Sequence, residues 1–129
     1  MSNFAFRELE GIDGIQKFCK LVIDEECQFD IYEDEINKNK KLSSQLGALY
    51  QAMQWVADLR SLPDTKFKDI TPNKETVKEF EFKSKDLRIY AIKIEDGKLI
   101  LIGGYKNKQN KDLRQFRSIK KRLLESGTL

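Results

Sequence analysis

The residues best suited to chemistry lie on two segments, 79–83 and 87–90, in which charged or polar and apolar side chains alternate. Such alternation predicts strands, and neighbouring strands would gather the polar side chains on one face: Glu79, Glu81, Lys83, Arg88 and Tyr90. A carboxylate can accept a proton, and the two cations can hold an anion such as phosphate. The alternative is a solvated face, where cross-strand ion pairs, including one from Arg88 to Glu79 or Glu81, contribute about 0.2–1 kcal/mol each.

A hairpin signal predicts which later residues join this polar face. Asp96-Gly97 separates two apolar runs and is typical of a two-residue turn, whose register would place Arg88 opposite Tyr105. Gly103-Gly104 removes side chains from the same strand, which indicates either a bulge or the close approach of a ligand. Three lysines follow at the edge of this surface and would bring phosphate-directed charge beside rings that can stack on bases: Lys106, Lys108 and Lys111.

The preceding turn and the opposite face complete the predicted sheet. A two-residue turn at 85–86 would pair Lys83 with Arg88. The same register pairs Glu81 with Tyr90. The other face is apolar and is expected to pack against helices; it comprises Phe80, Phe82, Ile89, Ala91, Ile100 and Ile102.

Composition narrows the chemistry further. The chain has no histidine, which excludes a Ser-His-Asp triad, a Cys-His pair and a His-ligated metal. Acid–base steps would fall to carboxylates, lysines, tyrosines or the substrate. The two cysteines lack the spacing of a disulfide framework or a zinc site, and we expect no metal and no cofactor. No apolar run reaches the length of a signal-peptide core or a membrane span, so we expect a cytoplasmic protein.

Charge is unevenly distributed along the 129 residues. Residues 1–36 carry a net charge of −7, residues 37–77 carry +3 and residues 78–122 carry +8, although the whole chain carries only +3. The basic second half indicates a polyanionic partner. The alternative is that its lysines merely keep a hydrophobic sheet in solution.

The remaining elements are expected to support the sheet. A β-branched segment at 18–23 predicts a first strand, helical spacing of apolar residues predicts helices over 27–36 and 42–59, and 112–124 predicts a closing helix. Residues 1–17 are expected to form an N-terminal arm or extension with no assigned structure. Trp55 lies beside the apolar stripe of its helix, where it either packs or serves a partner surface. One domain spanning 1–129 is predicted.

Four short motifs follow one another in the second half of the chain: Lys66-Phe67-Lys68-Asp69-Ile70, Glu79-Phe80-Glu81-Phe82-Lys83, Leu87-Arg88-Ile89-Tyr90, and Ile100-Leu101-Ile102-Gly103-Gly104-Tyr105-Lys106-Asn107-Lys108-Gln109. Their order and spacing resemble the RelE/ParE toxins of type II toxin–antitoxin systems, especially the HigB and phage-related branch. The similarity spans residues 21–124 and is greatest in the last three predicted strands.

The resemblance implies an α+β, RelE-like fold, in which a helical hairpin packs on a twisted antiparallel sheet of about four strands with a C-terminal helix. It also implies an activity, because many family members cleave mRNA in the ribosomal A site. Arg88 matches the arginine that begins the corresponding strand and would neutralise the scissile phosphate. Glu81 would deprotonate the ribose 2′-hydroxyl and Lys83 would support the phosphate, while RNA would contact Tyr90, Tyr105, Lys106, Lys108 and Lys111.

The resemblance further implies partners. A cognate antitoxin would keep the toxin silent and is expected to lay a helix or an extended arm over Arg88 and the basic surface. The ribosome and mRNA would be the targets, with no membrane involved. Assembly is left open between a toxin–antitoxin hetero-oligomer and a homo-oligomer.

Departures from the family pattern leave alternatives. RelE has lysines where this chain has Glu79 and Glu81, the position of its late tyrosine falls on Leu113, and the C-terminal histidine of other branches has no counterpart. The acid that protonates the leaving group is therefore unassigned among Tyr105, Lys106 and Lys108. The alternatives are a ParE-like, non-catalytic inhibitor of DNA gyrase and an inactive, RNA-binding member of the family.

Overall fold

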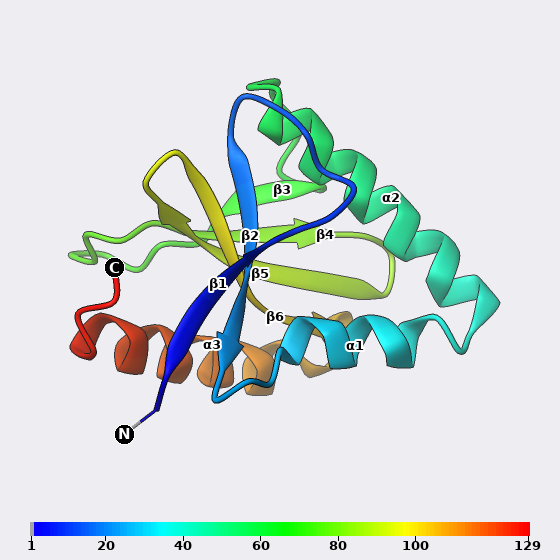
Figure 1. The fold of residues 1–129 in the computed structure, drawn as a ribbon. Coiled ribbons are helices and arrows are strands. Elements are labelled where there is room, and N and C mark those ends of the chain that lie inside the picture. Colours follow the sequence, from blue (N-terminus) through cyan, green and yellow to red (C-terminus); the bar gives the residue numbers. More distant parts are fainter. Residues whose placement is uncertain (1) are drawn as a thin grey trace.

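The computed structural model describes residues 2–129, which form three α-helices, one short 3-10 helix and six strands. In chain order these are β1 (Phe4–Glu8), β2 (Lys17–Ile23), α1 (Gln28–Ile36), α2 (Lys40–Ala57), β3 (Phe67–Asp69), β4 (Glu79–Lys83), β5 (Leu87–Ile94), β6 (Gly97–Tyr105), η1 (Lys106–Lys108) and α3 (Gln109–Glu125). The strands make one twisted sheet in the order β1-β2-β6-β5-β4-β3 (Figure 1).

The sheet is mixed and larger than predicted. The expected α+β class is correct, but six strands replace the expected four, and β2 runs parallel to β6 while the other neighbours are antiparallel. The additional strands are β1, within the segment expected to be an arm, and β3. β1 is mostly exposed, so it has no buried face that would require alternating apolar residues. β3 has only three residues, which is too few to show the alternation that marks a strand in a sequence.

Helices cover both faces of the sheet. α1 and α2 form the expected hairpin and pack on one face, where the core includes Phe29, Ile36, Leu49 and Met53. α3 packs on the other face through Phe116, Ile119 and Leu123. The face that carries the predicted polar cluster is therefore the face beneath α3. No helix in residues 2–129 is long and apolar enough to cross a membrane.

The hairpin between β5 and β6 differs from the predicted one. Ile94 pairs with Gly97, so the turn residues are Glu95 and Asp96, and Asp96 takes the positive φ of 65°. Aspartate tolerates this conformation because its short polar side chain can hydrogen-bond locally. Gly97 instead begins β6, where a Cβ atom would lie 1.8 Å from the carbonyl oxygen of Lys17 on β2. This glycine therefore permits the close approach of β2.

A β-bulge then changes which side chains share a face. The register shifts between Tyr90 and Ala91, so Arg88 lies opposite Gly104 and Tyr105 lies opposite Leu87. The prediction that Arg88 and Tyr105 share a face was wrong, because one extra residue inverts the alternation beyond it. Ile102 moves to the α3 side for the same reason. The β4–β5 register, with Lys83 opposite Arg88 and Glu81 opposite Tyr90, is as predicted.

The close contact at Gly97 predicts a large and local effect of substitution. Gly97→Ala should lower the free energy of unfolding by about 1–3 kcal/mol or more, because the backbones of β2 and β6 must separate to admit a methyl group. Urea unfolding followed by circular dichroism measures this. Gly47→Ala is the control: Gly47 is exposed on α2 with open space around it, and alanine should raise stability by roughly 0.5–1 kcal/mol. Equal effects of the two substitutions would contradict the contact.

Candidate functional site

Three of the predicted site residues lie together where β4 ends and β5 begins. Lys83 pairs with Arg88 across the two strands, and its Nζ lies 3.8 Å from Oε1 of Glu81. The strand alternation places all three on the face beneath α3, close to its N-terminal turn. We refer to Glu81, Lys83 and Arg88 as the charged cluster.

Arg88 is the unusual member of the charged cluster. It is only 6% exposed, and its Nη1 donates hydrogen bonds to the carbonyl oxygens of Ser84 (2.7 Å) and Leu87 (2.8 Å). Its Nε is buried without a partner among residues 2–129, and no carboxylate of this range forms an ion pair with it. The cross-strand ion pair that would make Arg88 purely structural does not form. No carboxylate of the described residues therefore compensates its charge.

Glu81 is nearly buried and is contacted from α3. It is 5% exposed, and its Oε2 accepts a hydrogen bond of 3.3 Å from Nε2 of Gln109, the first residue of the helix. Its other oxygen faces Lys83. Oε2 is therefore occupied by Gln109, whereas Oε1 has only the long contact with Lys83. Gln109 was not among the residues predicted for the site, although its place at the end of the last family-like motif is a signal that could have found it.

The two predicted aromatic contacts lie on opposite faces of the sheet. Tyr90 is fully buried and its ring stacks on Phe116 of α3, with centroids 5.5 Å apart, so it is not presented to solvent for stacking on a base. Its hydroxyl has no partner among the described residues, and burial raises its pKa. Tyr105 packs edge-on against Tyr32 and donates to Glu35 of α1 at 2.6 Å. Burial and this carboxylate raise the pKa of Tyr105 to about 12.

The paired glycines are explained by packing. A Cβ atom on Gly103 would lie 2.2 Å from the ring of Tyr32, and one on Gly104 would lie 2.3 Å from Oδ2 of Asp112. The same Asp112 oxygen accepts a hydrogen bond from the backbone N–H of Tyr105, so it ties the start of α3 to the end of β6. The glycines thus admit side chains of the protein, and the bulge lies earlier, at the Tyr90–Ala91 step.

The predicted lysines are exposed around the start of α3. Lys106 and Lys108 lie in η1, Lys111 lies in the first turns of α3, and Nζ of Lys108 is 5.8 Å from the centroid of the Tyr105 ring. Further basic side chains continue along the helix, among them Arg114 and Lys121. This forms a basic surface next to the charged cluster.

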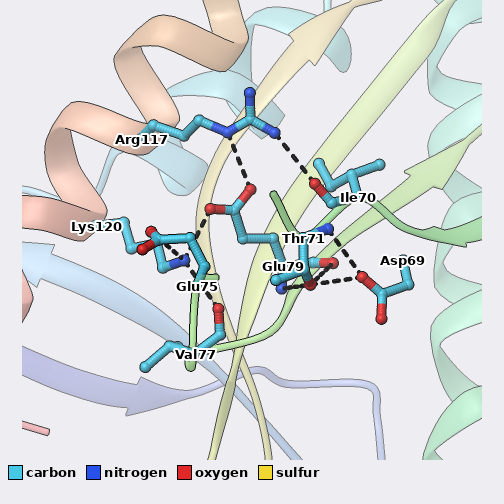
Figure 2. A network of polar contacts seen from close by, with 8 residues as sticks. All are labelled: Asp69, Ile70, Thr71, Glu75, Val77, Glu79, Arg117 and Lys120. Atoms are coloured by element: carbon cyan, nitrogen blue, oxygen red, sulfur yellow. Dashed lines mark hydrogen bonds and ion pairs between the residues drawn. The ribbon is translucent and has the colours of Figure 1, made fainter. Parts of the chain in front are cut away.

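Glu79 has a different role from the charged cluster. It is fully buried and accepts hydrogen bonds from Nε of Arg117 (3.0 Å) and Nζ of Lys120 (2.8 Å), both on α3 (Figure 2). Lys120 is itself 1% exposed and also donates to the carbonyl oxygen of Val77. Thr71 donates to the Asp69 carboxylate and accepts from the Glu79 N–H. Glu79 therefore fastens α3 to β4.

A second buried cation lies outside the candidate site. Lys98 is 6% exposed, its Nζ donates to Oε1 of Gln16 at 2.7 Å, and it lies over the rings of Phe80 (4.8 Å), Phe67 (5.6 Å) and Phe18 (6.0 Å). Burial and the neighbouring Lys93 lower its pKa from 10.5 to about 8. This lysine joins β6 to the aromatic edge of the sheet.

Comparisons of the chain with protein-family models, with curated proteins and with solved structures returned no match.

The Glu79 network predicts strong and non-additive effects on stability. Lys120→Ala should lower the free energy of unfolding by about 3–5 kcal/mol, because it removes one cation from a buried carboxylate. The double variant Glu79→Leu/Lys120→Met should lose much less free energy of unfolding than the sum of the losses in Glu79→Leu alone and Lys120→Met alone. Arg114→Ala, at an exposed position of the same helix, is the control and should change stability by less than about 0.5 kcal/mol. Additivity in chemical denaturation would show that the pair is not coupled.

Lys98 predicts a pH-dependent stability difference. The folded pKa is lowered, so the cost of charging Lys98 is fully present below pH 8 and disappears as pH rises from about 8 to 10.5, where the unfolded chain also loses the proton. Lys98→Met should therefore be more stable than the wild type near pH 7 by roughly 1–3 kcal/mol, with the gain shrinking toward pH 10. Denaturation across this range measures it, with the exposed Lys121→Met as control. A gain that does not change with pH would contradict the lowered pKa.

Proposed function

We propose that this chain is a cytoplasmic toxin of the RelE/ParE type that acts as a metal-free, ribosome-dependent mRNA endoribonuclease. The observation that carries the proposal is the uncompensated guanidinium of Arg88, which lies beside Lys83 and Glu81 and next to an exposed basic surface. A nearly buried cation without a carboxylate partner is stabilised when an anion binds, and the phosphate of RNA is such an anion.

The order of elements agrees with the proposal. A strand, a helical hairpin, three consecutive antiparallel strands and a final helix follow one another, as the resemblance to the family implies. β1 and β3 are added at the two edges of that sheet.

The proposed reaction uses the charged cluster in three roles. Glu81 takes the proton of a ribose 2′-hydroxyl, and the 2′-oxygen attacks the adjacent phosphorus in line with the 5′-oxygen that leaves. Arg88 and Lys83 neutralise the charge that develops on the phosphoryl oxygens. The bond to the 5′-oxygen breaks, which leaves a 2′,3′-cyclic phosphate and a 5′-hydroxyl.

The proton for the 5′-oxygen must come from another group. Tyr105 is a poor donor, because its hydroxyl is bonded to Glu35 and lies on the other face of the sheet from Arg88. Lys106 and Lys108 are exposed near the start of α3 and are better placed.

A second candidate function is supported by the covering of the sheet face. Tyr90 and Glu81 lie beneath α3, whereas the lysines at the start of α3 are exposed. This arrangement favours action by contact through the basic surface, without cleavage of RNA, as in a ParE-like inhibitor of DNA gyrase. Under either reading a cognate antitoxin is the proposed partner, because a freely active toxin would kill its host, and the complex would be a hetero-oligomer.

The test is induction of the chain in cells that lack an antitoxin. The wild type should halt growth and generate new mRNA 5′ ends within open reading frames, and Glu81→Gln should reduce the cleavage rate by about 10²–10⁴-fold, as expected for loss of a general base. Arg88→Ala should abolish toxicity. Lys38→Ala, at an exposed position between α1 and α2 and outside the basic surface, is the control for fold and expression.

The outcomes separate the candidate functions. Intact transcripts together with gyrase-bound DNA breaks would replace the nuclease by the gyrase inhibitor. Because Arg88 is nearly buried, circular dichroism must show that Arg88→Ala is folded, and Glu81→Gln provides an independent variant. Full cleavage activity in folded Glu81→Gln would remove Glu81 from the mechanism.

A further inference from the structure

A groove of about 380 Å³ lies between the outer face of α2 and the chain that returns to the sheet. Its lining includes the small or apolar side chains of Ala48, Ala52 and Leu62, the ring of Trp55, and two lysines, Lys66 and Lys83. We call it the Trp55 groove. Ala52 and Leu62 also pack against the core beneath α1 and α2, and no residue of η1 or α3 lines the groove.

Trp55 forms a fixed wall of the groove. Its side chain is on the surface, at 42% exposure, yet its indole N–H donates to the carbonyl oxygen of Ser61 at 2.9 Å. The guanidinium of Arg60 lies 4.5 Å from the ring centroid. The polar atom of the indole is therefore satisfied within the chain, and apolar ring surface remains for a partner.

The opposite wall is also held in place. Oε1 of Gln45 on α2 accepts hydrogen bonds from the Ser84 hydroxyl (2.6 Å) and the Asp86 N–H (2.8 Å), and its Nε2 donates to the Asp86 carboxylate (2.7 Å). These bonds fasten the β4–β5 turn to α2. A preformed site loses less conformational entropy on binding.

Charge indicates what the groove can bind. Lys66 and Lys83 line it, and no carboxylate of the described residues does so. Lys66 forms no ion pair within residues 2–129, and the pair of Lys83 with Glu81 is long, at 3.8 Å. An occupant must therefore combine an apolar side chain with negative charge.

We propose that the Trp55 groove binds an acidic, amphipathic segment of a partner protein. One aliphatic or aromatic side chain inserts between Trp55 and Leu62, and a carboxylate flanking it pairs with Lys66. Nucleic acid fits less well, because two cations around an apolar floor do not follow a phosphate backbone, whereas the exposed lysines of η1 and α3 do.

The groove shares Lys83 with the charged cluster. Its Nζ lies 3.8 Å from Glu81 on the face beneath α3, so the groove and the charged cluster adjoin at this residue. Binding of the segment to the groove does not rest on the proposed function.

Fluorescence of Trp55 can test the binding directly, because the chain contains one tryptophan. The probe is a synthetic helical peptide of about 15 residues with a leucine stripe on one face and glutamates on the other. Titration into the full chain should shift the Trp55 emission to shorter wavelength and saturate. The same peptide with lysines in place of its glutamates should bind at least tenfold more weakly.

Variants assign the binding to the groove. Lys66→Glu should lower the affinity for the acidic peptide at least tenfold. Lys68→Glu, at an exposed position on neighbouring β3 outside the groove, should leave this affinity unchanged. Ala48→Glu, which places a carboxylate in the groove on an exposed helical position, should abolish binding. Peptide binding by Arg88→Ala should be unchanged, so the groove is tested separately from the endoribonuclease.

Several results would overturn the proposal. These are the absence of a saturable shift, equal effects of Lys66→Glu and Lys68→Glu, and equal binding of the basic peptide. A Trp55 response to single-stranded oligouridine that depends on Lys66, with none to the peptide, would assign the groove to nucleic acid. A shift that depends only on protein concentration, with a dimer in light scattering, would assign it to a second copy of the chain.

Discussion

The buried carboxylate of Glu79 is the constraint on which the arrangement of this protein depends. A fully buried charge is costly unless cations and hydrogen bonds compensate it, and both of its cations, Arg117 and Lys120, come from α3. This network holds the helix on the polar face of the sheet and so converts half of that face into protein interior. The other half, the charged cluster, then lies against the first turn of the same helix.

Much of the sheet follows from local sequence, and the exceptions have non-local causes. Alternation in 79–83 and 87–90, together with a two-residue turn at 85–86, was sufficient to predict that Lys83 lies opposite Arg88. The β5–β6 turn was not predictable from Asp96-Gly97, because Gly97 is required by the approach of Lys17, eighty residues away in sequence. The bulge after Tyr90 is likewise unmarked, and it alone moves Tyr105 to the opposite face.

The candidate site shows the same division between local and non-local information. Strand alternation could gather the charges of Glu79, Glu81 and Arg88 on one face, but it could not decide which of them are paired. That depends on where α3 lies, which the helical pattern of its own residues does not specify. The placement of α3 pairs Glu79 and leaves Arg88 unpaired.

The contrast between these two charges bears on mechanism. Glu79 is compensated within the chain and needs nothing further, whereas Arg88 has only carbonyl oxygens and one buried N–H without a partner. Because a nearly buried cation is stabilised by an anion that reaches it, a negatively charged group gains more beside Arg88 than beside the cations that Glu79 already compensates.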